Sequence, residues 1–194
     1  MSKYITVTEN SPASAIRAYN SNLNATAQLW PILAVLEVAL RTTLNSQLEK
    51  RNGSNGVDTH WTLDRDNEIR RKNERASRDL NQAFENLSRK RKSASHGNII
   101  DELPLGFWTV LVSKRYKELW PDLAGGFRGL ESRDSKELDQ LLQFFKSFRN
   151  LIGHHHVIVF MDLELAMTKL LRLAHLIDPR LELILKELPE RRNP

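Results

Sequence analysis

Three residues near the end of a predicted helix combine the chemical groups that RNA strand cleavage needs. Arg149 supplies a fixed positive charge, Asn150 an amide and His154 an imidazole. An imidazole titrates near neutral pH and can move the proton of a ribose 2′-hydroxyl, while a guanidinium can bind the charge that builds on phosphate. Asn150 can orient the imidazole or the phosphate. The segment is therefore a candidate site for RNA cleavage.

The helix that carries these residues sets a condition on the site. Asn150 and His154 are four residues apart and share a face if the helix persists that far. Arg149 precedes His154 by five residues, so we expect the helix to loosen at Gly153 for the two side chains to converge. The activity thus depends on how this helix ends.

Two other interpretations of the same segment stay open. Histidines at a helix end often cap backbone carbonyls or lie in solvent, and Arg149 could pair with a carboxylate. A metal site is less favoured, because His154, His155 and His156 are consecutive and point in different directions on a regular backbone. No carboxylate stands at an obvious ligand spacing from them. We therefore expect no metal and no cofactor here.

Several other kinds of chemistry lack their signatures in this chain. The sequence has no glycine-rich phosphate loop, no dinucleotide fingerprint after a strand, no HExxH and no Gly-x-Ser-x-Gly. It also has no cysteine, which excludes disulfides, thiolate metal ligands and a cysteine nucleophile. The composition is compatible with a reducing cytoplasm.

The candidate segment resembles the motif of a known group of ribonucleases. Arg149-Asn150-x-x-x-His154 matches the Arg-polar-x(3)-His motif of HEPN-domain ribonucleases. More narrowly, three ordered blocks resemble the Abi-like family of bacterial abortive-infection proteins. The blocks are residues 36–41 (LEVALR), residues 103–108 (LPLGFW) followed by Tyr116, Leu119 and Trp120, and residues 149–155.

This resemblance implies a fold, an activity and a setting. It implies an all-helical HEPN-like bundle, often dimeric, that cuts RNA without metal in phage defence or in a toxin–antitoxin system. By position, Arg149 would bind and stabilise the phosphate, Asn150 would orient the site and His154 would transfer protons. The chain departs from the family pattern at Gly153, where Ala is usual, and at residues 156–157, where Glu-Pro is usual.

Three further residues are candidates for a supporting role. Glu37 and Arg41 lie four apart on one predicted helix and can form a partly buried ion pair. A structural pair that supports the core is the favoured interpretation, and the alternative is that the pair positions the catalytic arginine or histidine. His155 is the third, because it or His156 could supply a second proton-transfer group.

Positive charge is concentrated in the middle of the chain. The chain has 29 Lys and Arg against 24 Asp and Glu, a net charge of +5 and a pI near 9.6, which favours an anionic partner such as RNA. Residues 65–92 hold ten basic and five acidic residues. This surplus is either a solvated helix face or a path for RNA phosphates. The candidate RNA-binding residues are Arg71, Lys72, Lys90 and Arg91.

Helical periodicity predicts one all-α domain over residues 1–194, with a core from about residue 11 to residue 188. We expect six to seven helices and no sheet. Ser11-Pro12 predicts a helix start, and Pro31 either kinks a continuous helix or opens a second one. The other predicted elements are a loop over 51–57, helices over 64–92 and 107–120, a helix capped by Asp134 and Glu137, an extended run over 157–160, and helices over 162–177 and 179–188.

The N-terminus, the longest apolar stretch and the needs of the reaction lead to expectations about location and partners. The N-terminus lacks an export signal, and the apolar stretch Leu29–Leu40 is shorter than the ~20 residues of a membrane span, so we expect a cytoplasmic protein. Cleavage needs both an acid and a base, so we predict a homodimer that brings two motifs together, with Phe144 and Phe148 near the interface. The competing class is a non-catalytic helical module that binds RNA or a protein, and an antitoxin is a further candidate partner.

Overall fold

The computed structural model describes residues 12–54, 56, 59–64 and 67–188 of the 194-residue chain. Within these residues the protein is all-α and has no strand, as the periodicity predicted. This described part has nine α-helices instead of the expected six to seven, together with two short 3-10 helices, because two predicted helices are divided into shorter ones. The helices are α2 (Pro12–Ser54), α3 (Glu68–Lys72), α4 (Glu74–Arg89), α5 (His96–Glu102), α6 (Leu105–Val110), α7 (Trp120–Leu123), α8 (Lys136–Gly153), α9 (Leu163–Ile177) and α10 (Pro179–Glu187).

Helix α2 is the central element of the fold. It runs for 43 residues without a break at Pro31, so the continuous alternative is correct, and it also extends through the predicted loop start to Ser54. Ser11, the predicted cap, lies outside the described residues. Side chains at helical spacing bury one face of α2 on both sides of the proline: Leu29, Ile32, Leu33, Leu36, Leu40, Leu44 and Leu48. This burial offsets the backbone hydrogen bond that a proline removes.

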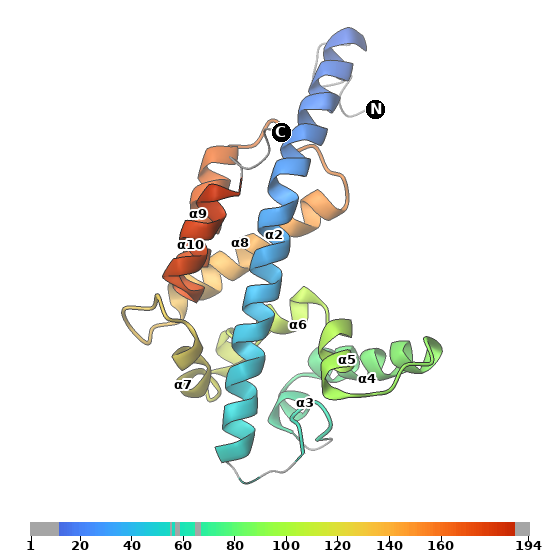
Figure 1. The fold of residues 1–194 in the computed structure, drawn as a ribbon, viewed down its shortest axis with the longest axis vertical. Helices are drawn as coiled ribbons and strands as arrows, with labels where there is room; N and C mark the ends of the chain where they lie inside the picture. Colours follow the sequence, from blue (N-terminus) through green and yellow to red (C-terminus); the bar gives the residue numbers. More distant parts are fainter. Residues whose placement is uncertain (1–11, 55, 57–58, 65–66, 189–194) are drawn as a thin grey trace.

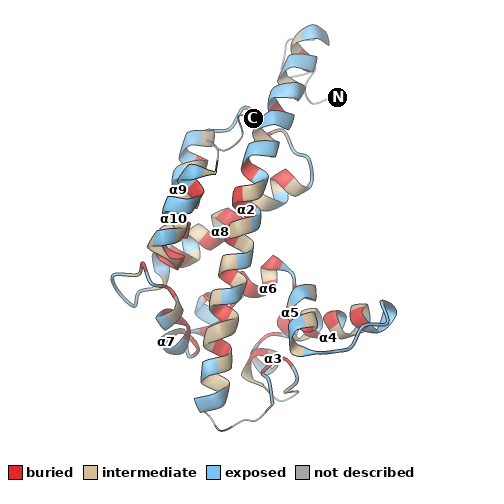
Figure 2. Ribbon diagram, in the orientation of Figure 1, coloured by how far each residue is buried: buried red, intermediate tan, exposed pale blue. Residues whose placement is uncertain are grey.

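The other helices pack around α2 in two groups (Figure 1). Helix α8 crosses α2, and α9 and α10 lie side by side next to it, while α3 to α7 surround the other end. Buried residues follow the inner face of α2, whereas its N-terminal turns project beyond the body and are mostly exposed (Figure 2). The residues of the candidate site therefore lie where α2 and α8 meet.

The basic middle of the chain is not one long helix, and that prediction is wrong. Asn67 caps α3 by accepting a hydrogen bond from the backbone N–H of Arg70 at 2.9 Å. Asn73 then ends α3 and caps α4, accepting from the N–H of Arg75 at 2.9 Å. Short amide side chains compete for backbone donors in this way, and the chain therefore turns between two helices.

The predicted helix over 107–120 is also replaced by shorter pieces. Helix α6 ends at Val110, whose carbonyl accepts from the Ser113 hydroxyl at 2.6 Å, and a 3-10 turn and α7 follow. Trp108 and Tyr116 are buried, and the Tyr116 hydroxyl donates to the carbonyl of Ile69 at 2.8 Å. Burial of Tyr116, the main cause, raises its pKa to about 12. These contacts favour compact turns over a straight helix.

The C-terminal third contains three helices, with two corrections to the prediction. Asp134 accepts from the N–H of Lys136 at 2.9 Å, but Ser135 is the N-cap residue of α8 and Glu137 pairs with Arg172 instead of closing a capping box. Residues 157–160 form a coil and turn, not a strand. Helices α9 and α10 begin after Asp162 and Asp178 as predicted, because each aspartate accepts a backbone N–H of the first turn.

Asp178 makes the start of α10 sensitive to acid. Hydrogen bonds from the Arg180 guanidinium, the main cause, hold the pKa of Asp178 well below its usual range. A depressed carboxyl pKa contributes stability above the unfolded pKa of about 4, and this is lost as the pH falls. We expect Asp178→Ala to cost about 1 kcal/mol at pH 7. Urea unfolding from pH 7 to 3 should show the gap from wild type beginning to narrow below about pH 4, with the rest lost only as the pH falls through the depressed pKa. A constant gap would contradict the assignment.

Helix α2 is long and apolar enough to cross a membrane, judged by length and composition alone. In its most apolar 18-residue stretch 28% of the residues are buried. The same helix packs against α6, α7, α8 and α9, so it is also the core helix of the fold. The expectation that the chain has no membrane span stays a prediction.

Candidate functional site

An ion-pair cluster links α8 to the middle of α2. The Nε of Arg149 lies 3.3 Å from Oε2 of Glu37, and Oε1 of Glu37 lies 3.9 Å from a terminal nitrogen of Arg41. Arg41 also forms an ion pair with Asp101 of α5, with 3.0 Å between its Nη1 and Oδ1 of Asp101, but the Asp101 side chain is 74% exposed. The half-buried Glu37 carboxylate thus sits between two guanidinium groups. One carboxylate faces two fixed cations, so the cluster can also accept an anion.

This cluster opens into a small pocket on the outer face of α2. The pocket holds about 220 Å³ and is lined by Trp30, Leu33, Ala34, Glu37, Val38, Arg41 and Arg149. The Arg149 guanidinium lies over the Trp30 ring, 5.6 Å from its centre, and Arg149 is 35% exposed. The guanidinium is therefore oriented by a carboxylate and an aromatic ring while it still reaches solvent.

Helix α8 persists through Gly153 and loosens one residue later than expected. The N–H of His154 still bonds to the carbonyl of Asn150 at 2.9 Å. His155 then takes the left-handed conformation, with φ of 54°, and the N–H of His156 returns to the carbonyl of Leu151 at 2.9 Å. This is a Schellman end, in which a left-handed residue closes the last turn and the following residue bonds back.

The structure brings Arg149, Glu37 and Arg41 together and places the other candidates at the adjacent helix end. Asn150, His154, His155 and His156 are all exposed. The Arg149 side chain runs toward that end, because a Cβ on Gly153 would lie 3.4 Å from its Nη1. The guanidinium therefore lies beside the residue that precedes His154. The alternative in which Arg149 pairs with a carboxylate is also realised, through Glu37.

Asn22 attaches the segment after the histidines to α2. Its amide oxygen accepts the N–H groups of Ile158 at 2.7 Å and Val159 at 3.1 Å, and its amide nitrogen donates to the carbonyl of His156 at 3.3 Å. Asn22 is 4% exposed. One buried side chain therefore fixes the backbone on the far side of the histidine run.

We expect Asn22→Ala to destabilise the fold by about 2 kcal/mol, because the buried N–H of Ile158 and the part-buried N–H of Val159 lose their acceptor. The exposed Asn24 on the same helix gives a matched control, and Asn24→Ala should change the free energy of unfolding by less than about 0.5 kcal/mol. Urea denaturation of both variants tests this. Equal stability of the two variants would show that the hydrogen bonds of Asn22 contribute nothing net.

Comparison with known protein families, curated proteins and solved structures finds no match to this chain. The resemblance to the Abi-like family and to HEPN ribonucleases thus stays an expectation drawn from the motifs. The geometry of the described residues must support the function by itself.

The four predicted RNA-binding residues divide into two kinds. Lys72 pairs with Glu68 at 2.6 Å and Glu118 at 2.7 Å, and Lys90 pairs with Glu102 at 2.5 Å. The hydrogen bond to Glu118 is the main cause that raises the pKa of Lys72. Arg71 and Arg91 are exposed. Ion pairs therefore engage two of the four residues that were predicted to bind phosphate.

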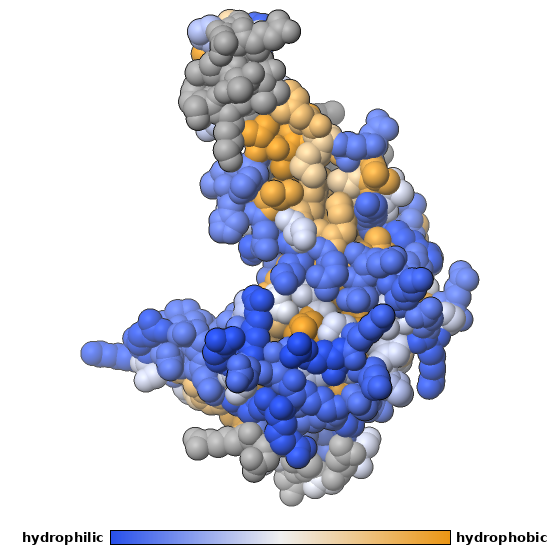
Figure 3. Space-filling model, turned by 180° about the vertical axis from the view of Figure 1, so that it is seen from behind, coloured by the Kyte–Doolittle hydropathy of each residue, from blue (hydrophilic) through white to orange (hydrophobic). Residues whose placement is uncertain are grey.

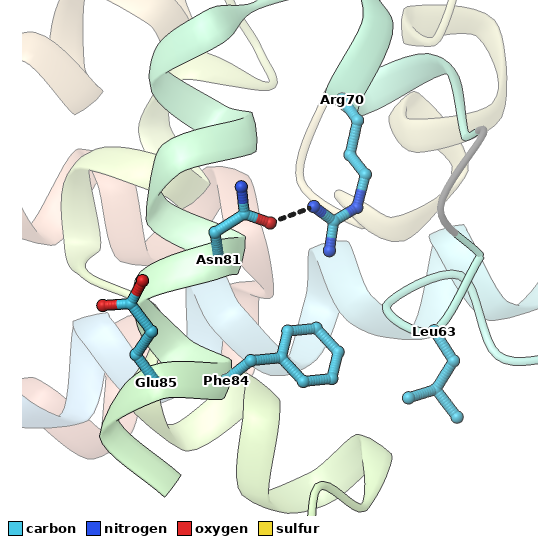
Figure 4. Close-up of a pocket in the computed structure, with 5 residues that line it drawn as sticks. All are labelled: Leu63, Arg70, Asn81, Phe84 and Glu85. Carbon is cyan, nitrogen blue, oxygen red and sulfur yellow. Dashed lines mark hydrogen bonds between the residues drawn. The ribbon is translucent and has the colours of Figure 1, made fainter. Parts of the chain in front are cut away.

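A larger pocket of about 580 Å³ lies near α4, away from the candidate site. Leu63, Arg70, Asn81, Phe84 and Glu85 line it (Figure 4). Arg70 donates to Asn81 at 2.8 Å and lies 5.9 Å from the centre of the Phe84 ring. The one arginine among these five residues is thus already held by Asn81 and Phe84. The five residues include no imidazole and no hydroxyl nucleophile. Size alone does not make it the better candidate.

Three residues around the site were not predicted from the sequence. Trp30 had a usable signal, since it lies seven residues before Glu37 and seven residues are close to two helical turns. Asn22 and Asp101 had none, because their partners are distant in sequence. The ion pair of Glu37 and Arg41 was predicted. A purely structural role was favoured for it, and contact with Arg149 was the alternative.

Proposed function

We propose that this protein is a metal-independent endoribonuclease of the HEPN type. The observation that supports it most is the Arg149 guanidinium, held by Glu37 and Trp30 and turned along α8 toward the end that bears His154. A preoriented guanidinium near a helix end that bears exposed imidazoles suits a reaction in which negative charge builds on phosphate. The motif resemblance points to the same activity, in phage defence or as the toxin of a toxin–antitoxin pair.

The proposed reaction is an internal transfer within RNA. The 2′-hydroxyl oxygen bonds to the adjacent phosphorus and gives its proton to a base, while the bond from phosphorus to the 5′ oxygen breaks and that oxygen takes a proton. The products are a 2′,3′-cyclic phosphate and a 5′-hydroxyl. Arg149 binds the phosphate oxygens, His154 transfers a proton, and Asn150 orients the phosphate. Glu37 and Arg41 position Arg149.

The proposal includes a homodimer, because the reaction needs an acid and a base and each chain has one motif. The Phe148 side chain is 1% exposed and cannot contact a partner, and Phe144 is half-buried, so the predicted interface near these two residues has little exposed apolar surface there. Exposed apolar residues instead share one face of α2, at Ile16, Tyr19, Leu23, Trp30 and Val38. Apolar side chains gather on the upper half of the molecule seen from behind, whereas the lower half is mostly hydrophilic (Figure 3).

This α2 face includes Trp30 and Val38, which also line the pocket at Arg149. A second copy on this face would bring two pockets close together, as an isologous interface requires. Light scattering on the full chain should give a dimer for wild type and a monomer for Leu23→Glu. A monomer for wild type with full activity would contradict this part of the proposal.

Cleavage separates the enzyme from a non-catalytic RNA-binding module, whereas binding does not. Purified protein is incubated with total RNA and transfer RNA in EDTA, beside His154→Ala, and the product ends are identified. We expect cyclic phosphate ends from wild type and none from the variant, which should keep the wild-type melting temperature because His154 is exposed. Salt-sensitive binding without cleavage by wild type would instead favour the binding module.

A further inference from the structure

Three potential metal ligands meet at the end of α2 that is remote from Arg149. They are Glu49 near the C-terminus of α2, His60 in the segment that follows, and His96 at the start of α5. Each offers one ligand atom, and these atoms lie within 4.8 Å of one another. The Nε2 of His96 lies 2.7 Å from Oε1 of Glu49, and the two imidazole rings stack with centres 4.2 Å apart.

Neighbouring side chains hold two of these ligands in place. The Thr62 hydroxyl is hydrogen-bonded to Nδ1 of His96 at 2.9 Å, which leaves Nε2 to face Glu49. Asn45 donates to Oε1 of Glu49 at 2.9 Å and is itself held by the indole N–H of Trp61 at 2.9 Å. Metal-binding histidines and carboxylates commonly have such partners, which fix ring orientation and tautomer.

We propose that Glu49, His60 and His96 bind a divalent transition metal, with Zn²⁺ as the ion they suit best. Two imidazoles and one carboxylate are a ligand set that Zn²⁺ accepts, with a fourth position left for water. The side chain of His96 is only 12% exposed, while Glu49 and His60 reach solvent and leave a path for the ion.

The bound ion would stabilise the fold and take no part in the RNA chemistry. It would tie the end of α2 to residue 60 and to the start of α5, which are distant in sequence. Glu49 lies twelve residues beyond Glu37 on α2, about 18 Å along the axis. The metal site is therefore separate from the candidate ribonuclease site, and its success or failure does not depend on the proposed activity.

The test is calorimetric titration of ZnCl₂ into the full chain, stripped beforehand with EDTA and dialysed. We expect one ion per chain and a melting temperature that rises with free Zn²⁺, because the ion binds the folded state. His60→Ala and Glu49→Gln should each weaken binding at least about 10-fold. Because His60 is exposed, His60→Ala should fold normally, and the melting temperature without metal checks this.

Two control variants address the other histidines. His175 pairs with Glu182 at 2.9 Å, a histidine–carboxylate pair like that of His96, and His175→Ala should bind Zn²⁺ as wild type does. The triple variant His154→Ala, His155→Ala and His156→Ala should also keep its affinity. The proposal is overturned if wild type binds no Zn²⁺, if His60→Ala binds as tightly as wild type, or if binding is lost with the histidine run.

Discussion

Arg149→Lys is expected to lower the rate of RNA cleavage by about 100- to 1000-fold, the usual loss when one oriented donor to a developing charge is removed. A lysine keeps the positive charge but has no planar fork, so it cannot bind Glu37 and a phosphate oxygen together with the same geometry. It also loses the guanidinium contact with the Trp30 ring. The expected loss is therefore in the chemical step, more than in RNA binding.

Single-turnover cleavage with saturating protein measures that step directly. Arg172→Lys is the matched control, because Arg172 makes the same type of ion pair with Glu137, at 2.7 Å, on another surface. It should cleave at the wild-type rate. Glu37→Gln keeps an acceptor but loses the charge, so a smaller reduction is expected. An unchanged rate for Arg149→Lys, with His154→Ala inactive, would remove Arg149 from the mechanism.

Local signals in the sequence predicted the fold class and several helix starts. The period of three and four residues in the apolar side chains identified α2, α8 and α9, and the helix predicted over 179–188 begins where α10 does. The same periodicity could not show that Asn73 divides the basic segment, because an amide that caps one helix and ends another is compatible with a continuous pattern. Short helices are also missed, because the helical period of apolar residues can be recognised only over several turns.

Local sequence signals also predicted only the part of the candidate site whose residues lie close together in the chain. Arg149 and His154 belong to one short motif, so the sequence brings them together. Trp30 and Asn22 act across more than a hundred residues of sequence, and only the packing of α2 against α8 brings them to that motif. That the histidine run holds no metal stays a prediction. Among the residues that the structure describes, ligand atoms close enough to share an ion belong to Glu49, His60 and His96. Spacing along the chain cannot reveal such a cluster.

Gly129 shows how closely packed backbone constrains this fold. A Cβ at this position would lie 1.9 Å from the carbonyl oxygen of His175 and 2.7 Å from its carbonyl carbon. The loop cannot move away freely, because the N–H groups of Arg128 and Gly129 bond to the carbonyls of Ile177 and Leu176, at 3.1 and 3.2 Å. A side chain at residue 129 must therefore displace the end of α9 or break both bonds.

We therefore expect Gly129→Ala to lower the free energy of unfolding by about 3 kcal/mol, the upper part of the range for overpacked sites. Gly125 lies in the same loop region, but a Cβ there would meet only the side-chain oxygen of Gln47, at 3.6 Å. Gly125→Ala should change stability by less than about 0.5 kcal/mol. Urea denaturation compares the free energies of unfolding of the two variants, provided that both show the same dependence of that free energy on urea concentration. Equal stability would mean that the loop and the end of α9 can separate without cost, against the two hydrogen bonds that join them.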